Sequence, residues 1–247
     1  MSLGNSLGLS VSNPRQSGSA FNACSCDFDG TDQDVQINNQ CSVINVYQFT
    51  FSFWAKLGTN TTSGVFFKFI SDSSDNQILC LWHGSGNEVR FTHKMNGQAD
   101  VCNGGSGNMA ENDNTWWHIA GTVDKATTNK IILYINGTAT ETITGVGTLG
   151  AGKVMETAAI ASNATSGAYI DATMNSVAFW NRDLGSDEIN LIYRGRANYN
   201  ALQQGGSDMF GYYILNDGNG ADKATNKADL TKPGTYNNSP IFLNDTP

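Results

Sequence analysis

Apolar and polar residues alternate along residues 117–123 and again along residues 131–136. A period of two is typical of β-strands that bury one face. Residues 124–129 between the two runs are rich in turn formers, and Asn136-Gly137 favours a tight turn because both residues tolerate positive φ. Threonine then occupies every second position over 138–144. This stretch is therefore predicted to form a three-stranded meander.

Similar short runs recur along most of the chain, and nothing in their order suggests alternating βαβ units. The predicted class is all-β, with two packed antiparallel sheets. Strands are expected near residues 24–29, 34–38, 47–57, 65–71, 77–83, 87–94, 115–124, 130–136, 139–144, 153–161, 168–171, 174–182 and 209–215.

One helix is predicted, over residues 186–194. Ser186 is the expected N-cap, two acids follow in the first turn, and Gly195 is the expected terminator. Residues 98–114 are mostly polar and are predicted to form a long loop, the kind of segment that often carries binding residues.

The composition and charge of the chain argue against several classes of partner. The chain has 247 residues, a formal net charge of −8, 27 glycines and only 4 prolines, which suits many short strands joined by turns. A net negative charge with dispersed cations argues against nucleic acid or an anionic membrane surface as partner. No apolar run approaches the length of a membrane span. The N-terminal residues lack the cationic start and apolar core of a secretory signal.

The five cysteines are Cys24, Cys26, Cys41, Cys80 and Cys102. Their number is odd, and their spacing matches no zinc pattern. We expect reduced, partly buried thiols in a protein that folds in the cytosol, with one or two disulfides as the alternative.

Five short motifs follow one another along the chain. They are CDFDGTDQDV at 26–35, FTFSFWAK at 49–56, WHIA at 117–120, LYING at 133–137 and MNSVAFWNRDL at 174–184. In this order they resemble the laminin-G-like, concanavalin A-like jelly rolls of lectins and glucanases. The resemblance implies a two-sheet antiparallel jelly-roll sandwich with the one short helix near 186–194.

The two ends of the chain carry a second resemblance. MSLGNSLGL at 1–9 and FGYYILNDG at 210–218, with an Asx- and Thr-rich tail, are similar to segments of lectin-like structural proteins of marine bacteriophages. The expected organisation is an extended arm at 1–22, the jelly roll at 23–197 and a C-terminal segment at 198–247. That segment is expected to pack on the jelly roll or on neighbours.

Catalysis is not expected. Some glucanases of this fold carry their acids as E-x-D-x-(x)-E on one strand. The best match here, Glu111-Asn112-Asp113, lacks the last acid and lies in the predicted loop. The three histidines are scattered, and His118 is expected to have a structural role.

A calcium site is the main metal hypothesis. Asp29, Asp32 and Asp34 form an oxygen-rich cluster of the kind that a hard cation needs. Related jelly rolls often bind calcium between this opening segment and a late strand. The late acid is replaced here by Asn175, although Asp171 lies nearby. Loss of an anionic ligand would weaken the site, and a solvated acidic turn is the alternative.

Saccharide binding would need an exposed aromatic ring beside amides and carboxylates. The candidates are Trp82, His83, Trp116 and Tyr169, which lie near predicted loops. Most of the other tryptophans are expected in the core.

The phage resemblance implies a non-enzymatic virion structural protein, such as a head decoration, fibre or tail-associated component, assembled in the host cytoplasm. Its expected partners are other virion proteins, further copies of itself and possible host-surface glycans. The rival hypothesis is a calcium-dependent carbohydrate-binding module of a bacterial surface or secreted protein.

Overall fold

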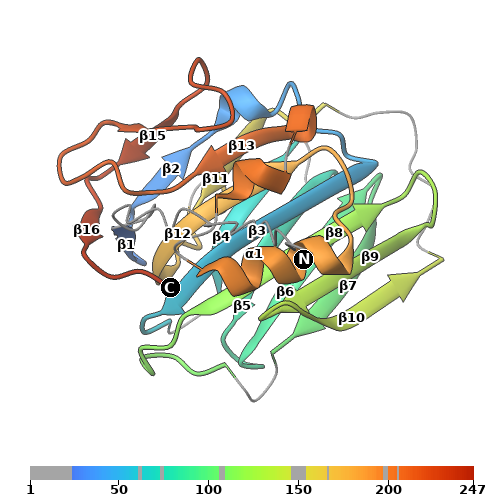
Figure 1. Cartoon of the computed structure of the whole chain (residues 1–247), viewed down its shortest axis with the longest axis horizontal. Coiled ribbons are helices and arrows are strands. Elements are labelled where there is room, and N and C mark those ends of the chain that lie inside the picture. Colours follow the sequence, from blue (N-terminus) through green and yellow to red (C-terminus); the bar gives the residue numbers. More distant parts are fainter. Residues whose placement is uncertain are drawn as a thin grey trace, which may run out of the picture.

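The computed structural model describes residues 24–60, 63–72, 75–105, 109–145, 154–165, 167–196, 200–204 and 206–247. Two antiparallel sheets of eight strands each pack face to face (Figure 1). This confirms the predicted all-β, two-sheet sandwich. The predicted arm at 1–22 lies outside the described residues. No described helix is long and apolar enough to cross a membrane.

Sheet A is built around the long central strands β3 and β12. Its strands, in spatial order, are β10 (Thr138–Thr144), β9 (Lys130–Ile135), β8 (Trp117–Asp124), β3 (Gln48–Leu57), β12 (Asp171–Trp180), β1 (Ser25–Asp29) and β16 (Ile241–Leu243), and β13 (Met209–Tyr213) also pairs with β12.

Sheet B faces sheet A across the core. Its strands, in spatial order, are β14 (Lys223–Ala224), β15 (Gly234–Asn237), β2 (Asp34–Gln36), β11 (Thr157–Ile160), β4 (Gly64–Ile70), β5 (Gln77–His83), β6 (Glu88–Met95) and β7 (Gln98–Gly104). The helical segments are α1 (Ser186–Gly195) and the short 3-10 turns η1 (Asn38–Gln40), η3 (Ala201–Gln204) and η4 (Gly206–Asp208).

Four sequence predictions need correction here. The strand expected at 168–171 does not form, since β12 begins only at Asp171. Gly195 is the last residue of α1, and the C-cap is Arg196, which takes a φ of 48°. Residues 98–104, predicted as part of a loop, form edge strand β7, because Asn96 and Gly97 both take positive φ and close a hairpin with β6. The polar composition of β7 misled the prediction, because only two of the seven residues of this edge strand are buried. In addition, Gly185 rather than Ser186 is the N-cap of α1, and its N–H donates to Glu188.

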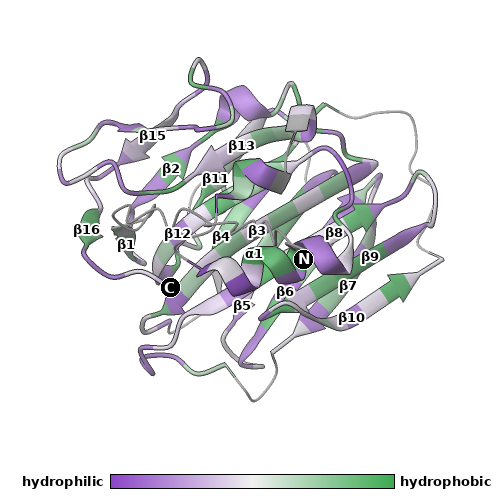
Figure 2. Cartoon of the chain, in the orientation of Figure 1, coloured by the Kyte–Doolittle hydropathy of each residue, from purple (hydrophilic) through white to green (hydrophobic). Residues whose placement is uncertain are grey.

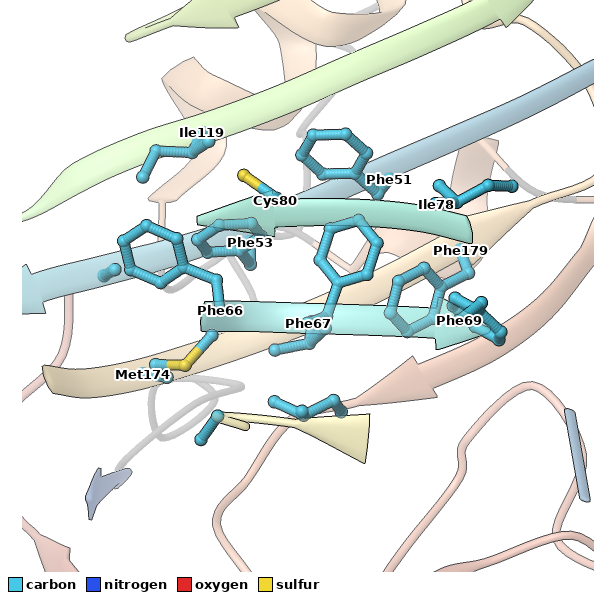
Figure 3. Packing of buried hydrophobic residues seen from close by; sticks show 14 of the residues in the cluster. Phe51, Phe53, Phe66, Phe67, Phe69, Ile78, Cys80, Ile119, Met174 and Phe179 are labelled. Atoms are coloured by element: carbon cyan, nitrogen blue, oxygen red, sulfur yellow. The ribbon is translucent and has the colours of Figure 1, made fainter. Parts of the chain in front are cut away.

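Phenylalanines fill the space between the sheets. Phe51 and Phe53 from β3 contact Phe66 and Phe67 from β4, and Figure 3 shows these rings between the strands. The Phe51 and Phe67 centroids are 4.7 Å apart in a tilted arrangement. Aromatic pairs at such distances add to the energy of burial itself. Figure 2 shows that apolar residues are concentrated in the strands and polar residues in the connections.

The C-terminal residues belong to both sheets. Strand β13 pairs with β12 and β16 pairs with β1 in sheet A, while β15 pairs with β2 in sheet B. The segment after residue 208 is therefore an integral part of both sheets of the sandwich.

Helix α1 covers part of the outer face of sheet A (Figure 1). Beneath it, the rings of Trp54 and Tyr193 stack with centroids 5.8 Å apart. His118 is fully buried beside them, with Nε2 2.8 Å from the Ser52 hydroxyl. Burial lowers the pKa of His118 to about 3, since the charged imidazolium would lose its hydration there.

This burial predicts a loss of stability in mild acid. The unfolded chain binds a proton at His118 below pH 6.5, whereas the folded chain stays neutral until about pH 3, so stability falls as the pH drops through this window. By about pH 4.5, two units below the unfolded value, the loss from this residue is about 3 kcal/mol. Chemical unfolding at several pH values measures it.

His118→Gln keeps a polar group near Ser52 but cannot titrate. We expect the unfolding free energy of this variant to fall less steeply between pH 7 and pH 4.5 than that of the natural chain. Equal slopes for the two proteins would contradict the assignment.

Candidate functional site

A polar hollow of about 240 Å³ opens on the outer face of sheet A, at the end where β1, β3 and β12 lie side by side. We call it the sheet A hollow. It is lined by Asp27, Lys56, Leu57, Gly58, Asn112, Asn114, Asp171 and Thr173.

Strand alternation places the polar side chains of the hollow in one row. Asp27 pairs across the strands with Thr173, and Thr173 pairs with Lys56. Their neighbours Cys26 and Met174 point into the core instead. The Thr173 hydroxyl donates to the Asp27 carboxylate at 2.7 Å, which fixes that carboxylate at the floor of the hollow.

Asp171 is the most constrained acid of the hollow. Its carboxylate accepts a hydrogen bond from the Thr59 N–H at 2.9 Å, and the Asn60 amide bonds both to its N–H and to its carbonyl. Burial raises the pKa of Asp171, and the negative charges of Asp27, Asp29 and Glu111 raise it further. The chain therefore holds several acids close together at this end of the sheet.

Gly58 makes the position of Asp171 possible. A Cβ atom at residue 58 would lie 1.9 Å from a carboxylate oxygen of Asp171, so any larger residue would displace that carboxylate. The Gly58 N–H also donates to the Asp171 carbonyl at 2.9 Å. Here glycine serves close approach, not a turn.

Lys56 and Trp116 form the rim of the hollow. The Lys56 ammonium lies 5.6 Å from the centroid of the half-buried Trp116 ring and donates to the Asn114 side chain at 2.9 Å. Asp245, from the C-terminal tail, pairs with Lys56 and accepts from the Trp116 indole N–H at 3.2 Å. Burial alone would raise the pKa of Asp245, but the hydrogen bonds from Lys56 and Trp116 lower it below its usual value.

A second hollow, of about 210 Å³, lies beside β2, β11 and β15 of sheet B. It brings together three of the predicted site residues, Asp32, Asp34 and the half-buried Tyr169. Asp34 is buried and accepts from Gln36 at 2.7 Å, from Ser162 at 2.6 Å and from Asn237. Donors of the chain itself thus already surround this carboxylate.

The four residues predicted to bind calcium do not meet in one place, because only Asp32 and Asp34 share the sheet B hollow. Asp29 pairs with Asp171 and accepts from the Thr31 N–H, whereas Asn175 lies four residues further along β12. The Asn175 amide donates to the Cys24 carbonyl at 2.7 Å, and its oxygen accepts from Ser176. Calcium requires six to eight oxygen ligands, and these residues do not fit it. Across the ranges that the structure describes, no group of three or more His, Cys, Asp or Glu residues is placed to hold a metal ion.

Trp82 is not an exposed platform. Its side chain is fully buried, because it alternates into the core, and its indole N–H donates to Glu111 at 2.7 Å. The next residue, His83, points the other way and lies 3.6 Å from Glu88. Of the four predicted ligand-binding residues, Trp82 and His83 line neither hollow. Trp116 lies near the sheet A hollow, and Tyr169 lines the sheet B hollow.

Sequence reasoning noted Asp171 only as an acid near Asn175 and did not group it with Asp27, Lys56 and Asn112. Three of them lie on strands whose period-2 pattern indicates an outward side chain, but which strands are neighbours could not be read from spacing. All five cysteines are free thiols, four of them buried.

Comparison with known proteins places this geometry in a family. The family model Laminin_G_3, described as the concanavalin A-like lectin/glucanases superfamily, matches residues 29–190. The chain belongs to this superfamily. A search of curated proteins by sequence finds no match.

Solved structures of this superfamily fold are similar at low sequence identity. The NanB sialidase of Streptococcus pneumoniae shares 11% identity at a TM-score of 0.58, over 68% of this chain and 27% of the sialidase chain. A heptameric SAP-like pentraxin of Limulus polyphemus shares 13% at 0.54, over 71% and 84%. A CBM40 of a Ruminococcus gnavus sialidase, bound to α2,6 sialyllactose, shares 12% at 0.56, over 71% and 100%.

These similarities show the fold alone, and this chain spans about a quarter of the length of the NanB sialidase. They support the laminin-G-like part of the sequence interpretation. The similarity of the chain ends to phage proteins stays a prediction.

The position of Asn175 yields a test that separates a metal ligand from a structural residue. Asn175→Asp removes the amide that donates to the Cys24 carbonyl and buries a carboxylate, so we expect the unfolding free energy to fall by about 2 kcal/mol. Thermal and chemical unfolding, each with millimolar calcium and with chelator, measure the effect.

The natural chain is the control, and its melting temperature should not depend on calcium. If calcium restored the stability of Asn175→Asp, this residue would lie at a latent calcium site, and our structural assignment would be wrong.

Proposed function

We propose that this chain is a non-catalytic, lectin-like domain that binds saccharides in the sheet A hollow. The observation that carries the proposal is the meeting of two carboxylates, two side-chain amides and a threonine around one open hollow. Sugar hydroxyls both donate and accept hydrogen bonds. A wall of mixed acceptors and donors is therefore suited to them.

A saccharide site also needs an aromatic ring beside its polar groups, and the rim of the hollow supplies one. The half-buried Trp116 ring lies near the hollow, with its centroid 5.6 Å from the ammonium of the lining residue Lys56. A large aromatic face packs well against the C–H groups of a pyranose, and its indole N–H is already satisfied by Asp245. The ligand-bound CBM40 of similar fold shows that this architecture can hold a saccharide in another protein.

A glycan array is the first experiment. We expect the folded protein to bind a subset of glycans with calcium and equally with chelator, since the predicted calcium ligands are used within the chain. Incubation with the bound glycans should release no reducing sugar. Failure to bind any glycan would contradict the proposal, and binding that needs calcium would favour the calcium-dependent module instead.

Variants locate the site on the array hits. Asp171→Ala removes a charged acceptor, and we expect about a tenfold or greater loss of affinity by titration calorimetry. Asp75→Ala is the matched control: it removes an exposed acid at the β4–β5 connection, at the opposite end of β4 from the hollow. Equal affinities for both variants would place the glycan elsewhere.

We further propose that the domain is displayed on a phage particle, as a decoration, fibre or tail-associated component. The similarity of residues 1–9 and 210–218 to lectin-like phage proteins supports this. Residues 210–218 include most of β13, so their sequence is also constrained by the sheet. Mass spectrometry of the particle fraction from the source culture should detect the chain. Its presence only in the bacterial envelope or secreted fraction would contradict a virion role.

A further inference from the structure

The charge around the sheet A hollow is strongly one-sided. Asp27 and Asp171 line it, and Asp29 and Glu111 lie close enough for their negative charges to act on Asp171. Of the described residues that line the hollow, Lys56 is the one cation. A ligand that enters the hollow therefore meets an excess of carboxylates.

The charge of Lys56 is already used. Its ammonium pairs with Asp245 and donates to the Asn114 side chain, and its side chain is only 14% exposed. The Asp245 carboxylate also accepts the Trp116 indole N–H. A carboxylate of the chain itself thus occupies the place where a ligand's carboxylate would find a cation and a second donor together.

From this arrangement we propose that the hollow selects neutral, hydroxyl-rich saccharides and discriminates against acidic ones such as sialosides. The inference rests on the proposed saccharide-binding function and specifies its ligand class. The proposed ligand class differs from the ligand of the CBM40 of similar fold, which is bound to α2,6 sialyllactose, a sialylated sugar.

Hydrogen-bond chemistry supports the neutral class. An ionised carboxylate only accepts hydrogen bonds, and its two oxygens can accept from neighbouring hydroxyls of one sugar ring. Asp27 has one oxygen that accepts from Thr173, and Asp171 has one that accepts from Thr59. Each carboxylate retains further acceptor capacity for a ligand.

Repulsion disfavours the acidic class. A sialoside carboxylate would have to give up water while lying near at least two like charges, and the nearest cation would first have to leave Asp245. Like charges placed together are a recognised source of specificity, because they act against the wrong ligand without strengthening the right one.

Matched glycan pairs test the inference. Each pair has one scaffold with and without a terminal α2,6 sialic acid, for example lactose and α2,6 sialyllactose, and affinities are measured at low and high salt. We expect the neutral member to bind at least tenfold more tightly at low salt, with a smaller ratio at high salt because screening weakens the repulsion.

Two variants should reduce the ratio by separate routes. Asp171→Asn removes one repelling charge and keeps an oxygen for the Thr59 N–H. Asp245→Asn frees the Lys56 ammonium for an incoming carboxylate. Asp75→Asn makes the same charge change away from the hollow and should leave the ratio unchanged. Because Asp245 lies in the tail, its variant remains informative if Asp171→Asn fails to fold.

The outcomes separate the two claims. If sialylated members bind as tightly as their neutral partners or more tightly, the selectivity is wrong and the saccharide-binding function stands. If neither member of any pair binds, and the array is also empty, both the function and the selectivity are overturned.

Discussion

Strand β12 pairs with β3 along one edge and with β1 and then β13 along the other, and the exchange between β1 and β13 takes place at Ser176. The register with β3 shifts between Asn175 and Ala178, and Ser176 has a φ of 53°. At this point the Ser176 N–H donates to Ile214, and the Asn175 amide holds the Cys24 carbonyl. An irregular residue in a central strand is thus satisfied by the ends of two different neighbours.

This junction divides sheet A into two working halves. Residues 171–174 of β12 pair with β1, and Asp171 and Thr173 among them line the hollow. Residues 177–180 pair with β13, and Ala178 and Trp180 among them pack in one apolar cluster with α1. The same topology explains why the C-terminal segment matters at the hollow. After β15 and β16 have joined both sheets, the chain returns to the β3 end, where Asp245 meets Lys56.

The sequence predicted the class, most strands and the helix because these depend on local periodicity and caps. It failed for β7, whose exposed side chains hide the period, and it did not predict β14 to β16, which are two to four residues long. For the hollow the difficulty was different. Asp27 and Asp171 are 144 positions apart, and only the antiparallel register of β1 with β12 makes them neighbours. Asn175 stands where related jelly rolls carry the late acid of the calcium site. Its amide instead donates to the Cys24 carbonyl at the junction in β12, and no motif predicts that role.

The position of Asp171 costs folding stability, and this cost suggests why the hollow is acidic. Burying a carboxylate near other acids opposes folding, and Gly58 leaves the space that this carboxylate needs at the expense of backbone freedom in the unfolded chain. A residue of similar size without charge would relieve the repulsion at no loss of packing. The Asn60 amide and the Thr59 N–H nevertheless fix Asp171 in place through three hydrogen bonds. An arrangement that lowers stability and is still held firmly is what a binding surface requires, because a rigid acceptor loses little entropy when a ligand hydroxyl meets it.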